Sequence, residues 1–170
     1  MKYGTMTFLS VDEMVLMIKK FERQNDPNSG FFTLPGGNLK EFERGTNLAG
    51  RLESAIREIE EESGLTLIKP VLRGVILFDN AGRVFDNWPN PQDFLVSIFS
   101  ARQYSGRLKT KTREGIPLWI AEKDIGGLPK NPGDAKMYEW LKDPRYFMGV
   151  IRHNERELDE SGTFVDYFYP

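Results

Sequence analysis

Residues 47 to 64 restrict the fold of this sequence more than any other segment, because their apolar residues recur at the spacing of one helix face. The stripe consists of Leu48, Leu52, Ala55, Ile56 and Ile59. This spacing predicts an amphipathic helix from about Asn47 to Ser63, with Thr46 as a candidate N-cap and Gly64 as the stop. A helix with one apolar stripe has to bury it against another element. The rest of the chain must therefore supply a facing layer.

Runs with strand character lie on both sides of this helix. "TMTFLSV" and "MVLMIKKF" flank Asp12 and Glu13 and predict a hairpin. "FFTLPGG" leads into a loop, and "NPGDAKMYEWL" predicts a turn and a second helix from about Asp134. The remaining strand-like runs are "VLRGVILF", "QDFLVSIFSA", "IPLWI", "YFMGVIRH" and "TFVDYFY", the last two as a final hairpin. Strands mixed with two helices predict the α/β (α+β) class.

Length and composition narrow the class of protein. With 170 residues, 39% of them hydrophobic, we expect a single domain over residues 1–170. A net charge of -2 implies no general surface for a nucleic acid polymer. The lack of cysteine excludes disulfides, and the single His153 cannot build a histidine metal site. Asp12 and Glu13 interrupt the first apolar run, so we expect no signal peptide, no membrane span and a cytoplasmic location.

The end of the predicted helix, "REIEEESGL", concentrates negative charge. At about 100° per residue, Glu58, Glu61 and Glu62 lie on one side of the helix, and Glu60 points elsewhere. Like charges at this spacing repel, and each carboxylate tends to keep a proton. A divalent cation removes the repulsion, and oxygen-only ligands select Mg²⁺ or Mn²⁺. The alternative is a solvated acidic helix in which Arg57 pairs with Glu61.

This segment resembles the core of the Nudix box, G-x5-E-x7-R-E-U-x-E-E-x-G-U, in which U is aliphatic. The residues that match its second half are Arg57, Glu58, Ile59, Glu61, Glu62, Gly64 and Leu65. Gly37 and Glu43 match the first half, but thirteen residues separate Glu43 from Arg57 where the pattern has seven. The unbroken apolar stripe predicts that the additional residues lengthen the helix at its N-terminal end.

The resemblance extends over nearly the whole chain, to bacterial MutT-like Nudix proteins of the 8-oxo-dGTP diphosphatase type. It implies a Nudix α/β/α sandwich around a mixed sheet. It also implies Mg²⁺-dependent (or Mn²⁺-dependent) hydrolysis of a nucleoside triphosphate to a monophosphate and pyrophosphate. The implied metal ligands are Glu58, Glu61 and Glu62, with Glu114 of "EGIPLW" either a further ligand or an exposed loop residue. Glu58, Glu61 and Glu114 all stay open as the general base, and Arg57 is expected to hold Glu61.

By the same resemblance, a substrate pocket is expected around the segment before the box and the second helix. The implied residues are Phe31, Phe32, Thr33, Gly36, Gly37, Leu128 and Asp134. Relatives that recognise oxidised guanine often read W-N-G where this chain has Phe32, Thr33 and Leu34. A threonine hydroxyl reads less of a base edge than an amide does, so we expect little preference for 8-oxo-dGTP. If the strand alternates, one of Phe31 and Phe32 is a core residue instead.

Other functions stay open at this point. Trp88, Pro89 and Pro91 lie in a loop that could cap the pocket. Within the enzyme class, the alternative is an ADP-ribose or nucleotide-sugar pyrophosphatase. Outside it, the alternative is a non-catalytic Nudix-fold nucleotide-binding regulator. In each case the expected partner is a small-molecule nucleotide, bound by a monomer or a homodimer.

Overall fold

Strands make up most of the regular structure in the computed structural model, which describes residues 1–24, 26, 28–40, 48–81, 83, 91–154 and 157–169. The strands are β1 (Lys2–Val11), β2 (Met14–Lys20), β3 (Phe32–Thr33), β4 (Gly36–Asn38), β5 (Leu65–Ile68), β6 (Val71–Asp79), β7 (Phe94–Ala101), β8 (Gln103–Gly106), β9 (Gly115–Ala121), β10 (Tyr146–Asn154), β11 (Glu157–Leu158) and β12 (Phe164–Phe168). The helices are α2 (Leu48–Ser63) and α3 (Pro132–Leu141), with 3-10 turns η1 (Glu122–Gly127) and η2 (Glu160–Gly162).

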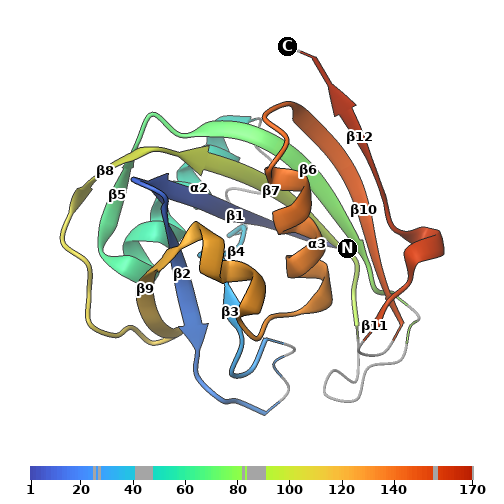
Figure 1. Ribbon diagram of the computed structural model, residues 1–170, viewed down its shortest axis with the longest axis horizontal. Coiled ribbons are helices and arrows are strands. Elements are labelled where there is room, and N and C mark those ends of the chain that lie inside the picture. Colours follow the sequence, from blue (N-terminus) through green and yellow to red (C-terminus); the bar gives the residue numbers. More distant parts are fainter. Residues whose placement is uncertain are drawn as a thin grey trace.

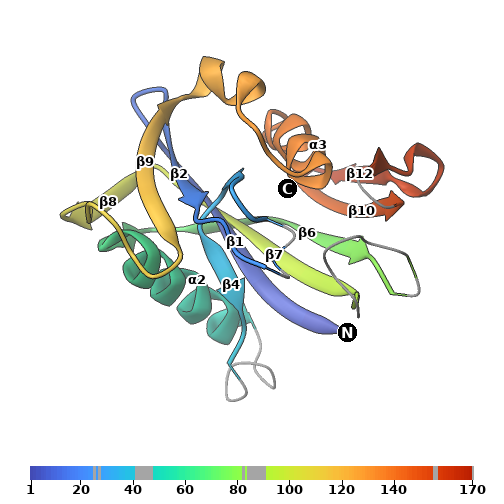
Figure 2. The ribbon, with the colours of Figure 1, turned by 90° about the horizontal axis from the view of Figure 1, so that it is seen from below.

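One curved, mixed sheet runs through the molecule in the order β11-β10-β6-β7-β1-β2-β3. In addition, β4 pairs with β1, β9 with β2 and β12 with β10, while β5 and β8 form a separate two-stranded sheet. The β1–β7 and β6–β10 pairs are parallel, whereas β6–β7 and β2–β9 are antiparallel. α2 and α3 lie on opposite sides of the sheet (Figure 1, Figure 2). The arrangement confirms the α/β/α sandwich around a mixed sheet.

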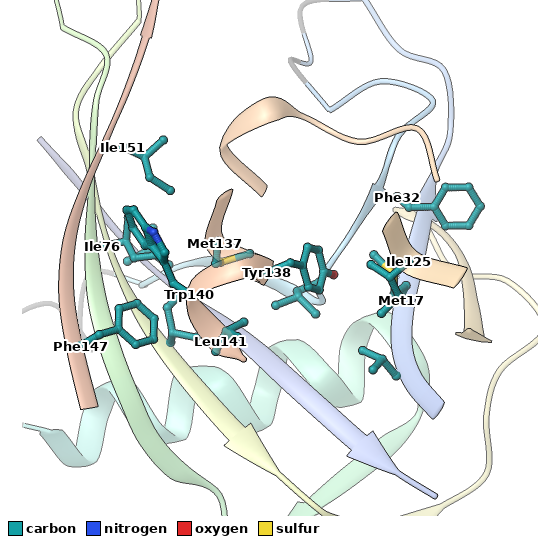
Figure 3. Packing of buried hydrophobic residues seen from close by; sticks show 14 residues of the cluster. Met17, Phe32, Ile76, Ile125, Met137, Tyr138, Trp140, Leu141, Phe147 and Ile151 are labelled. Atoms are coloured by element: carbon teal, nitrogen blue, oxygen red, sulfur yellow. The ribbon is translucent and has the colours of Figure 1, made fainter. Parts of the chain in front are cut away.

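Each helix closes a hydrophobic core against its own side of the sheet. On the α3 side, Met137 and Trp140 pack with Phe147 and Ile151 of β10 (Figure 3). On the α2 side, the buried cluster consists of Leu9, Leu16, Ile59, Leu65, Leu67 and Ala101.

α2 confirms most of the helix predicted from the apolar stripe. It is helical from Leu48, so residues 48–56 of the segment between Glu43 and Arg57 belong to the helix, whereas Asn47, Thr46 and Glu43 lie outside the described residues. Gly64 adopts a φ of 80° and its N–H donates to the Glu60 carbonyl at 3.0 Å, which ends the helix as expected.

One residue of the predicted stripe does not belong to the buried face. The Leu48 side chain is 53% exposed, whereas Ala55 and Ile59 are buried. Periodicity identifies a helix face, but it cannot show how far along the helix a facing element extends.

Two other boundaries differ from the sequence prediction. The "FFTLPGG" segment is not only a loop, because β3 pairs with β2 and β4 pairs with β1. α3 begins at Pro132, two residues before the predicted start, because the Asn131 side chain caps it by accepting from Gly133 N at 3.1 Å. The first hairpin (β1–β2) and the final one (β10–β12) are confirmed.

Candidate active site

The last turns of α2 bring two carboxylates against the glycine pair of β4. Glu62 Oε2 accepts a hydrogen bond from Gly36 N at 2.7 Å, and the residue is only 3% exposed. A Cβ atom at Gly37 would lie 2.5 Å from Glu58 Oε2, so any larger residue there would displace this carboxylate. The "LPGG" segment and the acidic helix end, which are far apart in the sequence, therefore form one site.

Arg57 forms ion pairs with two of the helix glutamates, Glu58 and Glu61. Its Nη1 atom lies 2.6 Å from Glu58 Oε1 and 3.5 Å from Glu61 Oε1. Lys40 Nζ also approaches Glu61, at 3.6 Å, and the Glu61 side chain is 55% exposed. The expected Arg57–Glu61 pair is present, but the Arg57 guanidinium lies closer to Glu58.

Lys20, at the end of β2, forms ion pairs with Glu62 and Glu114. Its Nζ atom lies 2.9 Å from Glu62 Oε1 and 3.5 Å from Glu114 Oε2. Arg23 Nη1 reaches the same Glu114 oxygen at 3.4 Å. Burial alone would lower the pKa of Lys20, but the two carboxylates raise it above 10.5, so the ammonium group stays charged. Glu114 and the helix carboxylate Glu62 therefore share the Lys20 ammonium group as a partner.

Glu58, Glu61, Glu62 and Glu114, called the carboxylate cluster below, offer the kind of ligand atom that a metal cation binds. Among the residues that the structure describes, no three acidic or histidine side chains converge closely enough to hold a metal ion. Instead, the Lys20 ammonium group lies between Glu62 and Glu114, where it contacts an oxygen of each. Carboxylate oxygens are the ligands that hard divalent ions prefer. Here two of these oxygens are in contact with the Lys20 ammonium group.

A cavity of about 420 Å³ leads away from the cluster. At the carboxylate end it is lined by Lys20, Gly37, Asn38 and Glu114. Its apolar wall consists of Met6, Phe78, Phe94 and Val96, which lie on adjacent strands β1, β6 and β7. At the far end it is lined by Asn80, Asn131, Asp134 and His153, from β10, the start of α3 and the residue after β6. This volume and this mixture of apolar wall and polar ends suit a small-molecule ligand.

The far end of the cavity carries buried polar groups. Asp134 is 5% exposed, and burial raises its pKa to about 6 against the lowering effect of a hydrogen bond with the Thr33 side chain. Its Oδ2 atom has no hydrogen-bond partner among the described residues. His153 Nδ1 lies 3.4 Å from Asn80 Oδ1, and its ring stacks on Phe78 with the planes 6° apart. Burial also lowers the pKa of His153, so its imidazole is neutral at pH 7.

The structure places the residues of the expected substrate pocket at different depths. Asp134 and Gly37 line the cavity. Thr33 is buried beside Asp134, and its hydroxyl oxygen also lies 3.3 Å from the Leu34 carbonyl oxygen. Phe32 belongs to the core, where Leu128 packs against it, which agrees with the alternative that one of the two phenylalanines is structural. Phe31 is half-buried and is not among the residues that line the cavity.

Sequence reasoning missed several residues that line the cavity. They are Lys2, Lys20, Phe78, Asn80, Phe94 and His153. Phe78 and Phe94 are opposed in the β6–β7 register, which the sequence does not specify. Lys20 follows another lysine at the end of a strand, so only alternation along β2 could have indicated that it points inward. Of the loop expected to cap the pocket, Trp88 and Pro89 lie outside the described residues.

A family model described as "NUDIX domain" matches residues 3–141. The chain belongs to the Nudix family. It is 30% identical over 135 residues to the Nudix hydrolase YvcI of Bacillus subtilis, a match that covers 78% of this chain and 74% of that protein. Membership confirms the expected hydrolase of pyrophosphate bonds, and Nudix hydrolases generally use divalent metal ions.

Solved structures show the same fold. The chain superposes on the MutT protein of Bacillus halodurans with a TM-score of 0.76, at 23% identity and over 98% of both chains. It also resembles the NUDIX domain of Shewanella oneidensis NrtR, solved in complex with ADP ribose, with a TM-score of 0.61 at 15% identity over 83% of this chain and 86% of that one. In the part of the chain that the structure describes, the helices are too short or too polar to cross a membrane.

Proposed function

We propose that this Nudix hydrolase cleaves a nucleoside triphosphate to a nucleoside monophosphate and pyrophosphate, with Mg²⁺ or Mn²⁺ as its cofactor, and that residues 1–170 act as a single domain. The observation that carries the proposal is the cavity, because Glu114 and Lys20, the partner of Glu62, line it together with an apolar wall and the buried polar residues Asp134 and His153. A nucleotide matches this arrangement, because it has charged phosphates at one end and a flat ring with polar edges at the other.

The base is proposed to lie at the far end of the cavity. Phe78 and Phe94 provide an apolar surface, and both lie on the sheet face that α3 covers. Asp134, with a pKa of about 6, is mostly ionised above pH 7 and then accepts hydrogen bonds from a ring N–H or an exocyclic amine. Thr33 acts on the base through Asp134, since its side chain contacts that carboxyl group.

The phosphates are proposed to lie at the carboxylate end. Glu58, Glu61, Glu62 and Glu114 would hold the metal, which supplies positive charge to the phosphates and lowers the pKa of a water molecule. Lys20 would place a further positive charge on the cavity wall. Arg57 fixes Glu58 through the 2.6 Å contact, so that this carboxylate keeps its direction relative to Gly37. Glu58, Glu61 and Glu114 stay the candidates for the carboxylate that takes the proton from water as it attacks phosphorus.

The experiment is a substrate panel with the purified chain of residues 1–170. Canonical nucleoside triphosphates, 8-oxo-dGTP, ADP-ribose and a nucleotide sugar are each incubated with Mg²⁺, and in parallel with EDTA. We expect pyrophosphate release from one or more triphosphates, with Mg²⁺ only, and less than about a tenfold preference for 8-oxo-dGTP over dGTP in kcat/KM, which corresponds to about 1.4 kcal/mol. Cleavage of ADP-ribose or the nucleotide sugar alone would replace the proposed substrate class, and nucleotide binding without turnover would indicate a regulator.

A further inference from the structure

Lys20 is the most deeply placed cation of the carboxylate cluster. Its side chain is 12% exposed, against 38% for Arg23 and 49% for Lys40. The Lys20 backbone is fixed at both sides, because its N–H donates to the Phe31 carbonyl at 2.9 Å and it is paired with Gly115 of β9. Movement of the ammonium group is therefore left to the four-carbon side chain, which is flexible.

The position of Lys20 explains how Glu62 tolerates burial. A buried carboxylate costs free energy unless it is paired and hydrogen-bonded. Glu62 satisfies both conditions, through Lys20 Nζ at 2.9 Å and Gly36 N at 2.7 Å. The same ammonium group reaches Glu114, which directly precedes β9. Lys20 thus ties together α2 and the β2–β9 pair at the point where the cavity begins.

A second cation cannot use the same oxygens while Lys20 stays in place. The ammonium group lies within 2.9 Å of Glu62 and 3.5 Å of Glu114, whereas metal–oxygen distances for Mg²⁺ are about 2.0–2.1 Å. A divalent ion between these two carboxylates would therefore come within a few ångströms of the Lys20 ammonium group, whose side chain is only 12% exposed. One of the two cations has to leave.

We propose that Lys20 is an internal counter-ion that holds Glu62 and Glu114 in the metal-free protein and is displaced into the cavity when a divalent cation binds. The inference rests on the proposed function for the identity of the cation. Displacement changes the role of the lysine, because its ammonium group then faces the space in which the phosphates of the substrate are proposed to lie. The protein thereby couples metal binding to the delivery of a positive charge toward the phosphates.

The first test measures Mn²⁺ affinity, without substrate or turnover, from the electron paramagnetic resonance signal of free Mn²⁺. The variant is Lys20→Met, and the matched control is Lys19→Met, because Lys19 is exposed on the opposite side of β2 and lies over the Phe32 ring. Lys20→Met removes the competing charge, so we expect it to bind Mn²⁺ at least about fivefold more tightly than the wild type, whereas Lys19→Met binds as the wild type does. Unchanged or weaker binding by Lys20→Met overturns the proposal.

The second test uses the wild-type chain, so it does not depend on how well a variant folds. Lysine acylation is followed by mass spectrometry with and without saturating Mn²⁺. We expect acylation of Lys20 to increase several-fold with Mn²⁺, while that of Lys19 stays constant; constant acylation of Lys20 contradicts displacement. If the wild type hydrolyses triphosphates but both Lys20 results are negative, the counter-ion proposal fails and the proposed function stands. If the Lys20 results are positive and no triphosphate is cleaved, the proposed function fails alone.

Discussion

At the scale of single residues, the glutamates of α2 differ in surroundings although they are adjacent in sequence. Glu62 is buried and paired with Lys20, whereas Glu61 is 55% exposed and shared by Arg57 and Lys40. Glu60 points away from the cluster and accepts from Thr66 Oγ1 at 2.8 Å. Helical periodicity predicted the separation of Glu60 from the others. It could not predict the difference in depth, which depends on where β2 and β4 lie.

Replacement of Glu61 and Glu62 by glutamine tests their proposed role and their surroundings together. Each substitution removes a charged ligand, so we expect kcat/KM with saturating Mg²⁺ to fall by about 10²-fold or more. Only Glu62→Gln should also lower the free energy of unfolding, by about 3 kcal/mol, because it leaves the buried Lys20 ammonium without its closest partner. The measurements are pyrophosphate release and urea unfolding. Glu60→Gln is the control, and near-normal turnover in both variants would contradict the assignment.

Asp134 predicts a dependence of stability on pH. Its folded-state pKa of about 6 lies above the ordinary value of 3.8, so the folded protein holds this proton more tightly than the unfolded chain does. The resulting stabilisation is complete below about pH 4 and is lost as the pH rises through 6. Asp134→Asn removes the ionisable group and should therefore be the more stable protein at pH 7.5, by up to about 3 kcal/mol, with a smaller difference at pH 5. Urea unfolding at both pH values measures this, and a larger advantage at pH 5 would reverse the sign and refute the argument.

At the scale of elements, long segments with a clear period were predictable and short ones were not. The hairpin of β1 and β2, the body of α2 and the strands β6, β7, β9 and β10 all follow from local pattern. β3, β4 and β11 have two or three residues each, too few to show a period. β4 exists because the backbone of Gly36 and Gly37 pairs with β1, and that contact depends on the whole sheet.

The junction of α2 and β5 gives a prediction about a glycine. Gly64 has a φ of 80°, and a Cβ atom there would lie 2.8 Å from the Arg107 carbonyl oxygen. Gly64→Ala should therefore lower the free energy of unfolding by about 1–2 kcal/mol, since an L-residue resists this conformation. Gly127→Ala is the control, because no heavy atom lies within 4 Å of its added Cβ and its φ is not positive. Equal urea midpoints for the two variants would show that the junction adapts without cost.

At the scale of the whole molecule, the cavity unites parts of the chain that are distant in sequence. Gly37 and Glu114 lie at one end, and Asn80, Asp134 and His153 at the other. The motif identified the acidic end because its residues are close together on one helix. The opposite end depends on parallel pairing of β6 with β10, a long-range contact that leaves no local signal in the sequence.

The same long-range pairing predicts the behaviour of a shortened chain. The family model ends at residue 141, yet β10 lies inside the sheet between β6 and β12. Phe147 and Ile151 of β10 are fully buried and share a core with Trp140 of α3 (Figure 3). A chain of residues 1–141 would expose this core and one long edge of β6, which invites aggregation.

We therefore expect residues 1–141 to lack a cooperative urea transition and to aggregate, although this segment holds every residue of the carboxylate cluster. Loss of the two buried side chains of β10 alone removes about 3–6 kcal/mol of hydrophobic stabilisation, a large share of the total for a domain of this size. The control is residues 1–168, which keeps β12 and lacks only the exposed Tyr169 and the last residue. Circular dichroism during urea unfolding and size-exclusion chromatography measure the outcome. A cooperative, monomeric 1–141 would show that the segment matched by the family model folds without β10. In that case His153 would not be required for the fold that forms the rest of the cavity.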